Sequence, residues 1–325
     1  MAGRFAPSPT GELHLGNART ALLAWLWARS EGLPFVLRME DLDLPRVRPG
    51  LAARPLAELR WLGLDWDQGP DVGGPHAPYT QSERTGLYDA AFARLQAQGA
   101  VYPCFCSRTE LQAARSEASA PHGPADEGPR YPGTCAGLSS AQASERARTR
   151  APAFRVRVAP GGVRFEDAVQ GPQVYDPHAE VGDFVVRRAD GIYAYQLAVV
   201  VDDAAMGMTQ VLRGEDLLAS TARQIGLYRL LGLTEPRFAH APLMLGPVGE
   251  EGVAQRLSKR DRAVSLGALR EDGAEAREVV ARLARSCGVS GGEVGACGPG
   301  ELVGGFRAGD IGRGRPATSP SPSTA

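Results

Sequence analysis

The sequence has 325 residues, with 36 lysines and arginines against 37 aspartates and glutamates, and 43% of its residues are apolar. This length and composition are typical of a globular protein of about two domains, and the net charge of −1 announces no nucleic-acid partner, which would need a local basic face. No apolar run reaches the roughly 20 residues that span a bilayer. The N-terminus MAGRFAPSPTG also lacks a signal-peptide pattern, so we expect a cytoplasmic protein without membrane contact.

The N-terminal part of the chain predicts a β-α-β unit. Residues 2–7 predict a short strand, residues 17–31 carry apolar side chains at helical spacing, and residues 35–39 predict a second strand. A strand–helix–strand order of this length favours parallel pairing of the two strands. Further helices are predicted at 51–63 and 83–98.

The amino-acid composition changes after Cys104. The segment from there to about Cys135 is rich in Ser, Pro and Gly, which indicates an insertion. The later elements are predicted strands at 153–158 and 184–188, a buried apolar run at 195–201, and an amphipathic helix at 216–232. From about residue 288 the composition shifts to Gly, Ser, Pro and Thr, which predicts a disordered tail.

The stretch PSPTGELHLGN at 7–17 joins a predicted strand to the start of a predicted helix. The first turn of a helix offers backbone N–H groups and the positive end of the helix dipole to an anion. His14 and Asn17 stand where their side chains could donate hydrogen bonds to a phosphate. A tight turn capped by a polar residue explains the same pattern, and the residues alone leave both interpretations open.

A second candidate is RLSKRD at 256–261, where Lys259 could follow a moving phosphate charge, although a solvated basic loop is the simpler interpretation of this stretch alone. Taken together, the two stretches resemble the paired HIGH and KMSKS signatures of class I aminoacyl-tRNA synthetases. The stretch RFAPSPTGELHLGNART resembles sequences of the glutamyl branch of that family. So do LRMEDLD, YAYQLAVVVDD and VLRGEDLL further along the chain.

The resemblance implies an α/β fold, with a Rossmann-type catalytic domain, an inserted zinc-containing subdomain that resembles an acceptor-end domain, and a short helical C-terminal part. The implied divisions are 1–103 and 183–245 for the two catalytic halves, 104–182 for the insertion, 246–287 for the KMSKS-like loop and helical stem, and 288–325 for the tail.

The resemblance also implies the site residues. His14 and Lys259 match the catalytic positions and, with Gly16 and Asn17, the ATP site. The implied glutamate site consists of Arg4, Phe5, Ala6, Pro7, Ser8, Glu40, Tyr195 and Arg213. Glutamate carries two carboxylates and one ammonium group, so cations at 4 and 213 and an anion at 40 match its charges. ATP is expected to arrive with Mg²⁺. The sequence departs from the signature at Arg256, which replaces the first KMSKS lysine.

The insertion contains a CxC pair, Cys104 and Cys106, followed by Tyr131 and Cys135 in a YxxxC pattern. This spacing resembles the zinc-binding pattern of one subgroup of the family and implies one structural Zn²⁺ with three thiolates and a phenolate. His122 competes with Tyr131 as fourth ligand. Three reduced, buried cysteines without a metal are the alternative.

The sequence after Lys259 is short compared with the anticodon-reading part of ordinary glutamyl-tRNA synthetases, and in this it resembles the glutamyl-Q tRNA(Asp) synthetases. That subgroup implies activation of L-glutamate by ATP without tRNA, then transfer to the queuosine base at the wobble position of tRNA(Asp), by a monomer. The alternatives are a truncated glutamyl-tRNA synthetase that charges the 3′ end of tRNA(Glu), and a non-catalytic paralogue that binds tRNA.

Overall fold

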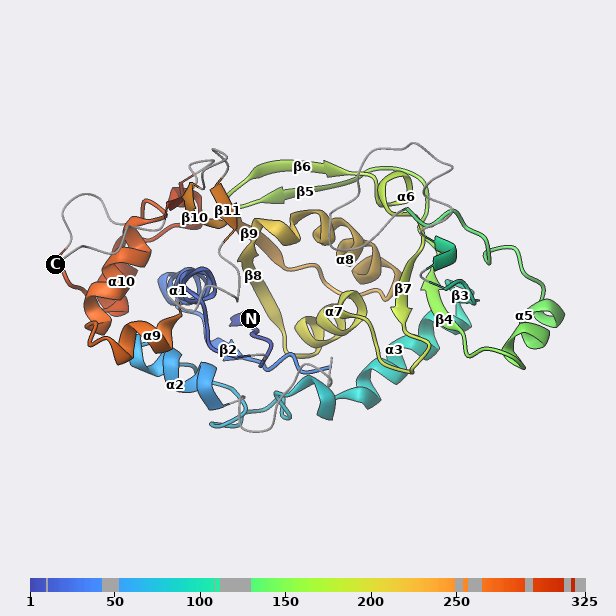
Figure 1. Cartoon of the computed structure of the whole chain (residues 1–325), viewed down its shortest axis with the longest axis horizontal. Coiled ribbons are helices and arrows are strands. Elements are labelled where there is room, and N and C mark those ends of the chain that lie inside the picture. The colour runs from blue at the N-terminus through green and yellow to red at the C-terminus, as the bar shows by residue number, and fades with distance from the viewer. Residues whose placement is uncertain are drawn as a thin grey trace.

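The computed structural model describes residues 1–9, 11–42, 53–107, 109–111, 130–248, 254–256, 265–289, 295–312 and 317–318. A six-stranded sheet of order β2-β1-β8-β9-β5-β6 runs through the middle of an elongated molecule (Figure 1). Its strands are β1 (Ala2–Phe5), β2 (Phe35–Leu37), β5 (Val163–Asp167), β6 (Gly171–Tyr175), β8 (Met208–Gly214) and β9 (Arg237–Ala241). All neighbours pair in parallel except β5 and β6, so the sheet is mixed.

The predicted β-α-β unit is confirmed. Helix α1 (Leu15–Ser30) connects β1 to β2, which pair in parallel with Gly3 opposite Phe35. The helix lies very close to β1, because a Cβ added at Gly3 would come within 2.8 Å of the Ala28 Cβ. Apolar residues surround α1, and most of its residues from Leu15 to Ala28 are buried. A helix that is apolar all round must be covered on every side.

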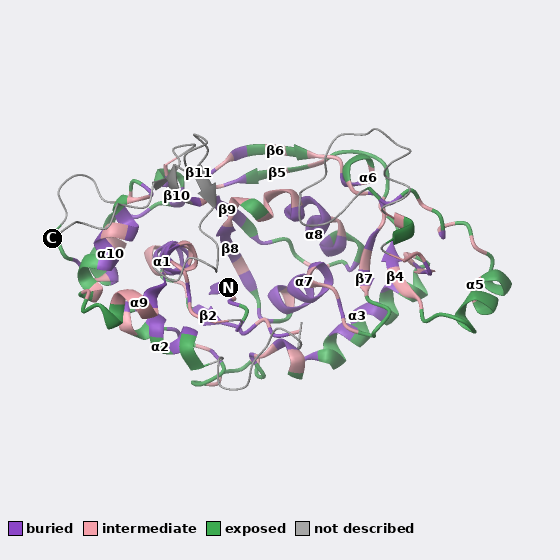
Figure 2. Ribbon diagram, in the orientation of Figure 1, coloured by how far each residue is buried: buried purple, intermediate pink, exposed green. Residues whose placement is uncertain are grey.

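The predicted helices in the first hundred residues are also confirmed, as α2 (Ala53–Trp61) and α3 (Thr85–Ala97), with a short 3-10 turn η2 (Gln81–Glu83) between them. The apolar run at 195–201 forms the first part of α7 (Tyr195–Ala205), and the predicted amphipathic helix is α8 (Leu218–Leu230), preceded by η3 (Glu215–Leu217). Helices α3, α7 and α8 share a second core with β8 and β9. Figure 2 shows the buried residues concentrated in this central region.

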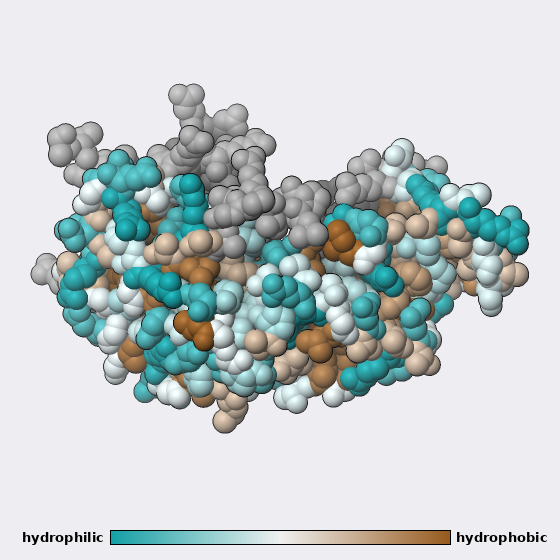
Figure 3. Space-filling model, turned by 90° about the horizontal axis from the view of Figure 1, so that it is seen from below, coloured by the Kyte–Doolittle hydropathy of each residue, from teal (hydrophilic) through white to brown (hydrophobic). Residues whose placement is uncertain are grey.

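A separate three-stranded antiparallel sheet lies toward one end of the molecule, in the order β3 (Val101–Cys104), β4 (Ala153–Val156), β7 (Phe184–Arg187). Near it lie α6 (Pro177–Glu180) and α5 (Ser140–Ala147), and α5 buries none of its residues. Figure 3 shows hydrophilic side chains on this projecting end. The hairpin β5–β6 falls inside the predicted insertion, yet it extends the main sheet through β9. The domain boundaries stay a prediction.

The other end of the molecule contains α9 (Leu266–Glu271), α10 (Ala276–Arg285), and the 3-10 segments η5 (Pro299–Gly305) and η6 (Ala308–Asp310). A small sheet joins β10 (Met244–Val248), β11 (Ala254–Arg256) and β12 (Ala317–Thr318). None of the described helices is long and apolar enough to cross a membrane.

The described part of the predicted tail, residues 295–312, differs from the expected disorder. Cys297, Phe306 and Ile311 are buried, with 2%, 6% and 1% of their surface exposed, and belong to the same core as α1. The segment is rich in glycine, but apolar residues between the glycines pack into the core that contains α1. Composition does not contain the positions of individual apolar residues, so the prediction of disorder was wrong for residues 295–312.

Candidate active site and metal centre

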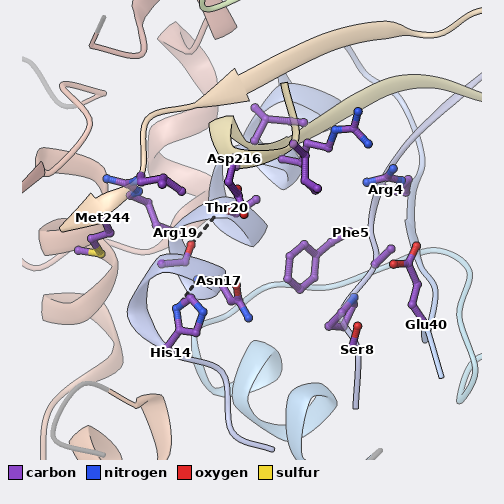
Figure 4. Close-up of a pocket in the computed structure, with 18 of the residues that line it drawn as sticks. Arg4, Phe5, Ser8, His14, Asn17, Arg19, Thr20, Glu40, Asp216 and Met244 are labelled. Atoms are coloured by element: carbon purple, nitrogen blue, oxygen red, sulfur yellow. Dashed lines mark hydrogen bonds between the residues drawn. The ribbon is translucent and has the colours of Figure 1, made fainter. Parts of the chain in front are cut away.

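A cavity of about 370 Å³ lies at the carboxyl edge of the parallel strands, between the end of β1 and the start of α1 (Figure 4). The chain passes from β1 to β2 on one side and later returns to β8 on the other, so β1 and β8 form a switch point of the sheet. Loops diverge at such a point and leave a crevice for ligands. The strand ends of β8 and β9 contribute further lining residues, including Arg213 and Pro242.

All the predicted glutamate-site residues line this one cavity: Arg4, Phe5, Ala6, Pro7, Ser8, Glu40, Tyr195 and Arg213. His14, Gly16 and Asn17 line it as well. In Figure 4, Arg4, Ser8 and Glu40 stand at one side of the cavity, opposite His14 and Asn17 at the helix start. Lys259 lies outside the described residues.

His14 is the N-cap of α1. Its backbone is extended, with ψ of 161°, and its Nδ1 accepts a hydrogen bond of 3.2 Å from the backbone N–H of Asn17. In a neutral ring this bond puts the proton on Nε2. Gly16 leaves room for the ring, because a Cβ there would lie 3.0 Å from two of its atoms. His14 therefore has the capping role, and it also lines the cavity at the positive end of the helix.

A buried ionic network lies beneath the cavity. Arg4 donates to Asp203 through Nε at 3.1 Å and through Nη2 at 2.9 Å, and Arg38 reaches the same carboxylate at 2.7 Å. Burial alone would raise the pKa of Asp203, but Arg4 and Arg38 hold it down at about 2. The neighbouring Asp202 accepts from Arg84 at 2.6 Å. Arg4 thus meets the cavity with its charge already balanced by a carboxylate.

Glu40 is one of two acidic residues that line the cavity, the other being Asp216. The Glu40 side chain is 11% exposed, and its Oε1 lies 3.1 Å from Arg38 Nη2. Burial raises the pKa of Glu40, and the nearby Arg38 and Arg4 only partly offset this effect. An ammonium group of a ligand would therefore stabilise the ionised form of this carboxylate.

Arg213 is held differently from Arg4. Its Nε donates to His240 at 3.0 Å, its Nη2 to Thr221 at 2.7 Å, and its Nη1 lies 3.4 Å from the Tyr195 hydroxyl. No carboxylate in the described part of the chain lies within 4.0 Å of its guanidinium nitrogens. Arg213 therefore presents a positive charge that has no direct counter-ion among the described residues.

Sequence reasoning did not identify several residues of this site. Asp203 and Arg38 lie in motifs that were noticed, VVVDD and LRMEDLD, but their pairing with Arg4 was not expected. Arg19 also lines the cavity; it donates to the Pro242 carbonyl, and its Nε and Nη1 find no hydrogen-bond partner among the described residues. Two adjacent aspartates at the end of an apolar run were the available signal, since buried carboxylates need cations.

The predicted metal ligands lie together at the end of β3. The thiols of Cys104, Cys106 and Cys135 are all within 4.8 Å of one another. The Tyr131 hydroxyl oxygen accepts hydrogen bonds from the Cys104 thiol at 3.5 Å and from the Cys135 backbone N–H at 2.8 Å. Burial, together with the adjacent thiols of Cys104 and Cys135, raises the pKa of Cys106 to about 12. A divalent cation would remove this penalty, so the donor set fits Zn²⁺. His122 lies outside the described residues.

Residues 1–295 match the family model described as tRNA synthetases class I (E and Q), catalytic domain. The chain belongs to this family. Its members are aminoacyl-tRNA-synthetase-like ligases, and the class I α/β fold agrees with the switch-point cavity described above.

Two curated sequences and one solved structure are similar to this chain over most of its length. A glutamyl-Q tRNA(Asp) synthetase from Symbiobacterium thermophilum is 57% identical over 290 residues, which are 89% of this chain and 87% of that protein. A glutamate–tRNA ligase 1 from Halorhodospira halophila is 49% identical over 284 residues, which are 87% of this chain and 57% of that protein. The crystal structure of a glutamate-tRNA synthetase from Elizabethkingia anophelis superposes with a TM-score of 0.83 at 29% identity, covering 98% of this chain and 68% of its own.

Proposed function

We propose that this chain is an ATP-dependent ligase that converts L-glutamate to glutamyl-adenylate without tRNA and then transfers the glutamate to the queuosine base at the wobble position of tRNA(Asp). One observation carries the proposal: Arg213, Glu40 and the start of α1 capped by His14 line a single cavity. These groups match the carboxylate, the ammonium group and the phosphates of the two small substrates.

Glutamate recognition follows from the charges of the lining residues. The ammonium group pairs with Glu40, whose ionised form it stabilises, and a carboxylate pairs with Arg213, which has no carboxylate partner among the described residues. Arginine donates two parallel hydrogen bonds to a carboxylate. Glutamine has a carboxamide in place of one carboxylate, and leaving a buried cation without its anion costs a few kcal/mol.

Adenylate formation needs no nucleophile from the protein. An oxygen of the glutamate α-carboxylate attacks the α-phosphorus of ATP, the new P–O bond forms, and the bond to the bridging oxygen breaks as pyrophosphate leaves with the electron pair. His14, the N-terminus of α1 and Lys259 stabilise the charge on the phosphates. Mg²⁺ enters bound to ATP as part of the substrate. Catalysis then consists of positioning and charge stabilisation.

The choice of acceptor is supported by the 57% identity to a protein named glutamyl-Q tRNA(Asp) synthetase. In the second step a nucleophilic group of the modified base attacks the acyl carbon of the adenylate and releases AMP. We assign the tRNA contact to the exposed basic face around α5, which includes Arg146, Arg148 and Arg150. Binding through such a face weakens as salt concentration rises.

The cysteine cluster holds, in this proposal, one structural zinc ion bound by Cys104, Cys106, Cys135 and Tyr131. When bound, the ion supplies no chemistry to the reaction; it ties the segment around residues 131–135 to the end of β3. The support is the convergence of three thiols and a hydroxyl contributed by two separate segments.

Two assays test the proposed function. Pyrophosphate exchange with glutamate and ATP is expected without any tRNA, and labelled glutamate is expected on tRNA(Asp) only when that tRNA contains queuosine. Mapping the label to the wobble base supports the proposal. Exchange that appears only with tRNA(Glu), or label at the 3′ end, contradicts it.

The second candidate is a glutamyl-tRNA synthetase activity that charges tRNA(Glu), favoured by the 49% identity to a glutamate–tRNA ligase 1. The same labelling experiment decides between the two acceptors. A chain that binds tRNA and yields no exchange under either condition would instead be the non-catalytic paralogue.

A further inference from the structure

Arg213 and His240 are direct neighbours across the parallel strands β8 and β9, where their Cα atoms are register partners. The Arg213 Nε donates to His240 Nε2 at 3.0 Å, so Nε2 must carry a lone pair rather than a proton. His240 is fully buried, with 0% exposure. The bond therefore requires one particular tautomer of this ring, with its proton on Nδ1.

Asp167 enforces that tautomer. Its Oδ2 lies 2.5 Å from His240 Nδ1, while its Oδ1 accepts backbone N–H groups of Val169 at 3.0 Å, Gln170 at 2.8 Å and His240 at 3.1 Å. An ionised carboxylate only accepts hydrogen bonds, so the proton facing Oδ2 belongs to Nδ1. The donors thus run in one direction, from Arg213 to His240 to Asp167.

The charges of these three residues are compatible with hydrogen bonds that are donated from Arg213 to His240 and from His240 to Asp167. Burial lowers the pKa of His240 to about 4, although the hydrogen bond to Asp167 opposes this effect, so the ring is neutral near pH 7. A neutral ring does not repel Arg213, and it keeps Asp167 out of direct contact with the guanidinium. In contrast to Arg4, which Asp203 neutralises through two bonds, Arg213 is oriented without being neutralised by a direct pair.

We propose that Asp167 and His240 are positioning residues, which fix the orientation of Arg213 so that its charge meets a carboxylate of the amino-acid substrate. This inference rests on the proposed function, because it takes Arg213 to contact glutamate. It assigns the hairpin β5–β6, which supplies Asp167 from the far edge of the sheet, a part in substrate selection.

The decisive variant is Asp167→Asn. The three backbone N–H groups still require an acceptor at the Oδ1 position, so the amide nitrogen takes the place of Oδ2 and donates to His240 Nδ1. The ring must then carry its proton on Nε2, facing the Nε–H of Arg213, and two donors oppose each other. A wrong tautomer of this kind is costly in the well-known serine protease triad.

We expect Asp167→Asn to raise the KM for glutamate about 10- to 100-fold, the loss that corresponds to one hydrogen bond to a charged group, with the KM for ATP within about twofold. His240→Gln, which can place an amide oxygen at the Nε2 position, should bind glutamate better than His240→Leu. Asp176→Asn is the matched control, because Asp176 is a partly buried helix cap far from Arg213 in the chain and asparagine also caps helices.

A measurement on the unmodified protein keeps the inference testable if the variants fold poorly. The chain has 5 histidines, so ring-¹⁵N-labelled protein gives a spectrum in which His240→Gln identifies the His240 signals. A protonated Nδ1 and an unprotonated Nε2 are expected, and the opposite tautomer overturns the inference. If the wild type exchanges pyrophosphate with glutamate but Asp167→Asn has an unchanged KM, the positioning role alone fails. If the wild type gives no exchange, the proposed function fails.

Discussion

Arg4 and Arg213 are two of the three arginines that line the cavity, and their partners determine what each can do there. Arg4 is paired with Asp203 through two hydrogen bonds, so it adds donors to the cavity but little net charge. Arg213 is held by neutral groups and keeps its charge for a ligand. Of these two arginines, Arg213 is therefore the one that brings an unbalanced positive charge to the cavity.

The first prediction concerns Glu40 and pH. Because burial raises the pKa of Glu40 above 4.5 and a bound ammonium group would lower it again, glutamate binds better to the ionised form. We expect the KM for glutamate to rise as the pH falls through this raised pKa, while the KM for ATP changes less. Steady-state pyrophosphate exchange across this range measures both values.

The matched variant for this prediction is Glu40→Gln, which should raise the KM for glutamate about 10- to 100-fold and remove this component of its pH dependence. An unchanged pH profile in the variant would show that another group titrates.

The second prediction separates the two roles of His14. His14→Ala removes the cap of α1 and should lower the free energy of unfolding by about 1 kcal/mol, and it should reduce pyrophosphate exchange about 100-fold or more. His14→Asn retains a capping side chain but lacks the ring N–H. Its stability in urea should match the wild type while its exchange rate stays low. Recovery of the rate in His14→Asn would show that capping is the whole function of His14.

For single residues, the sequence predicted which side chains line the cavity better than it predicted which side chains they pair with. Each residue of PSPTGELHLGN that was assigned to the cavity and is described by the structure lines it, because strand, loop and helix start are close in the chain. The pairing of Arg213 with His240 joins residues 27 positions apart, and that of Arg4 with Asp203 joins residues 199 apart. Such pairs depend on the order of strands in the sheet, which local patterns do not contain.

At the scale of elements, residues 163–175 were assigned to an insertion with no strand predicted there, and in the structure they form the hairpin β5–β6, which joins the main sheet. Its contact with β9 is a single register pair, Asp167 with Phe238, and no periodicity in the sequence could indicate it. The sequence also left undecided whether the apolar run at 195–201 forms a strand or a helix, since a short continuous apolar stretch suits either one when it is buried. The β-α-β unit was predictable because its pattern is local.

The third prediction concerns the cysteine cluster. Elemental analysis of the purified chain should find about one zinc per molecule, in agreement with three thiols within 4.8 Å. Cys135→Ser should lose the metal and lower the melting temperature. Cys297→Ser is the control, because Cys297 is also a buried free thiol but lies in a different core. Wild-type protein without zinc, or Cys135→Ser with full zinc, would contradict the assignment.

At the scale of the whole molecule, the ionic network around Asp203 joins β1, the segment after β2 and helix α7. Folding lowers the pKa of Asp203 from 3.8 to about 2, so its ionised form stabilises the folded state at pH values above 3.8. This stabilisation is lost as the pH falls from about 4 towards 2. It amounts to about 2 kcal/mol, at 1.36 kcal/mol per pKa unit.

The fourth prediction follows from this network. Asp203→Asn leaves Arg4 and Arg38 without their shared carboxylate and should lower the free energy of unfolding at pH 7 by about 3–5 kcal/mol. It should also reduce the loss of stability between pH 4 and pH 3. Urea unfolding at several pH values measures both effects, and Asp190→Asn, at an exposed ion pair, serves as control. A variant as stable as the wild type would show that solvent reaches these arginines.

The cover of α1 has a consequence for how the chain is made. The helix is complete by Ser30, but its apolar sides rest against α10 and η5, whose residues come some 250 positions later. A ribosome adds about 5–20 residues per second, so the nascent helix waits on the order of ten seconds to a minute for these partners. During that interval its leucines and tryptophans are open to chaperones, and newly made chains are at their most prone to aggregate.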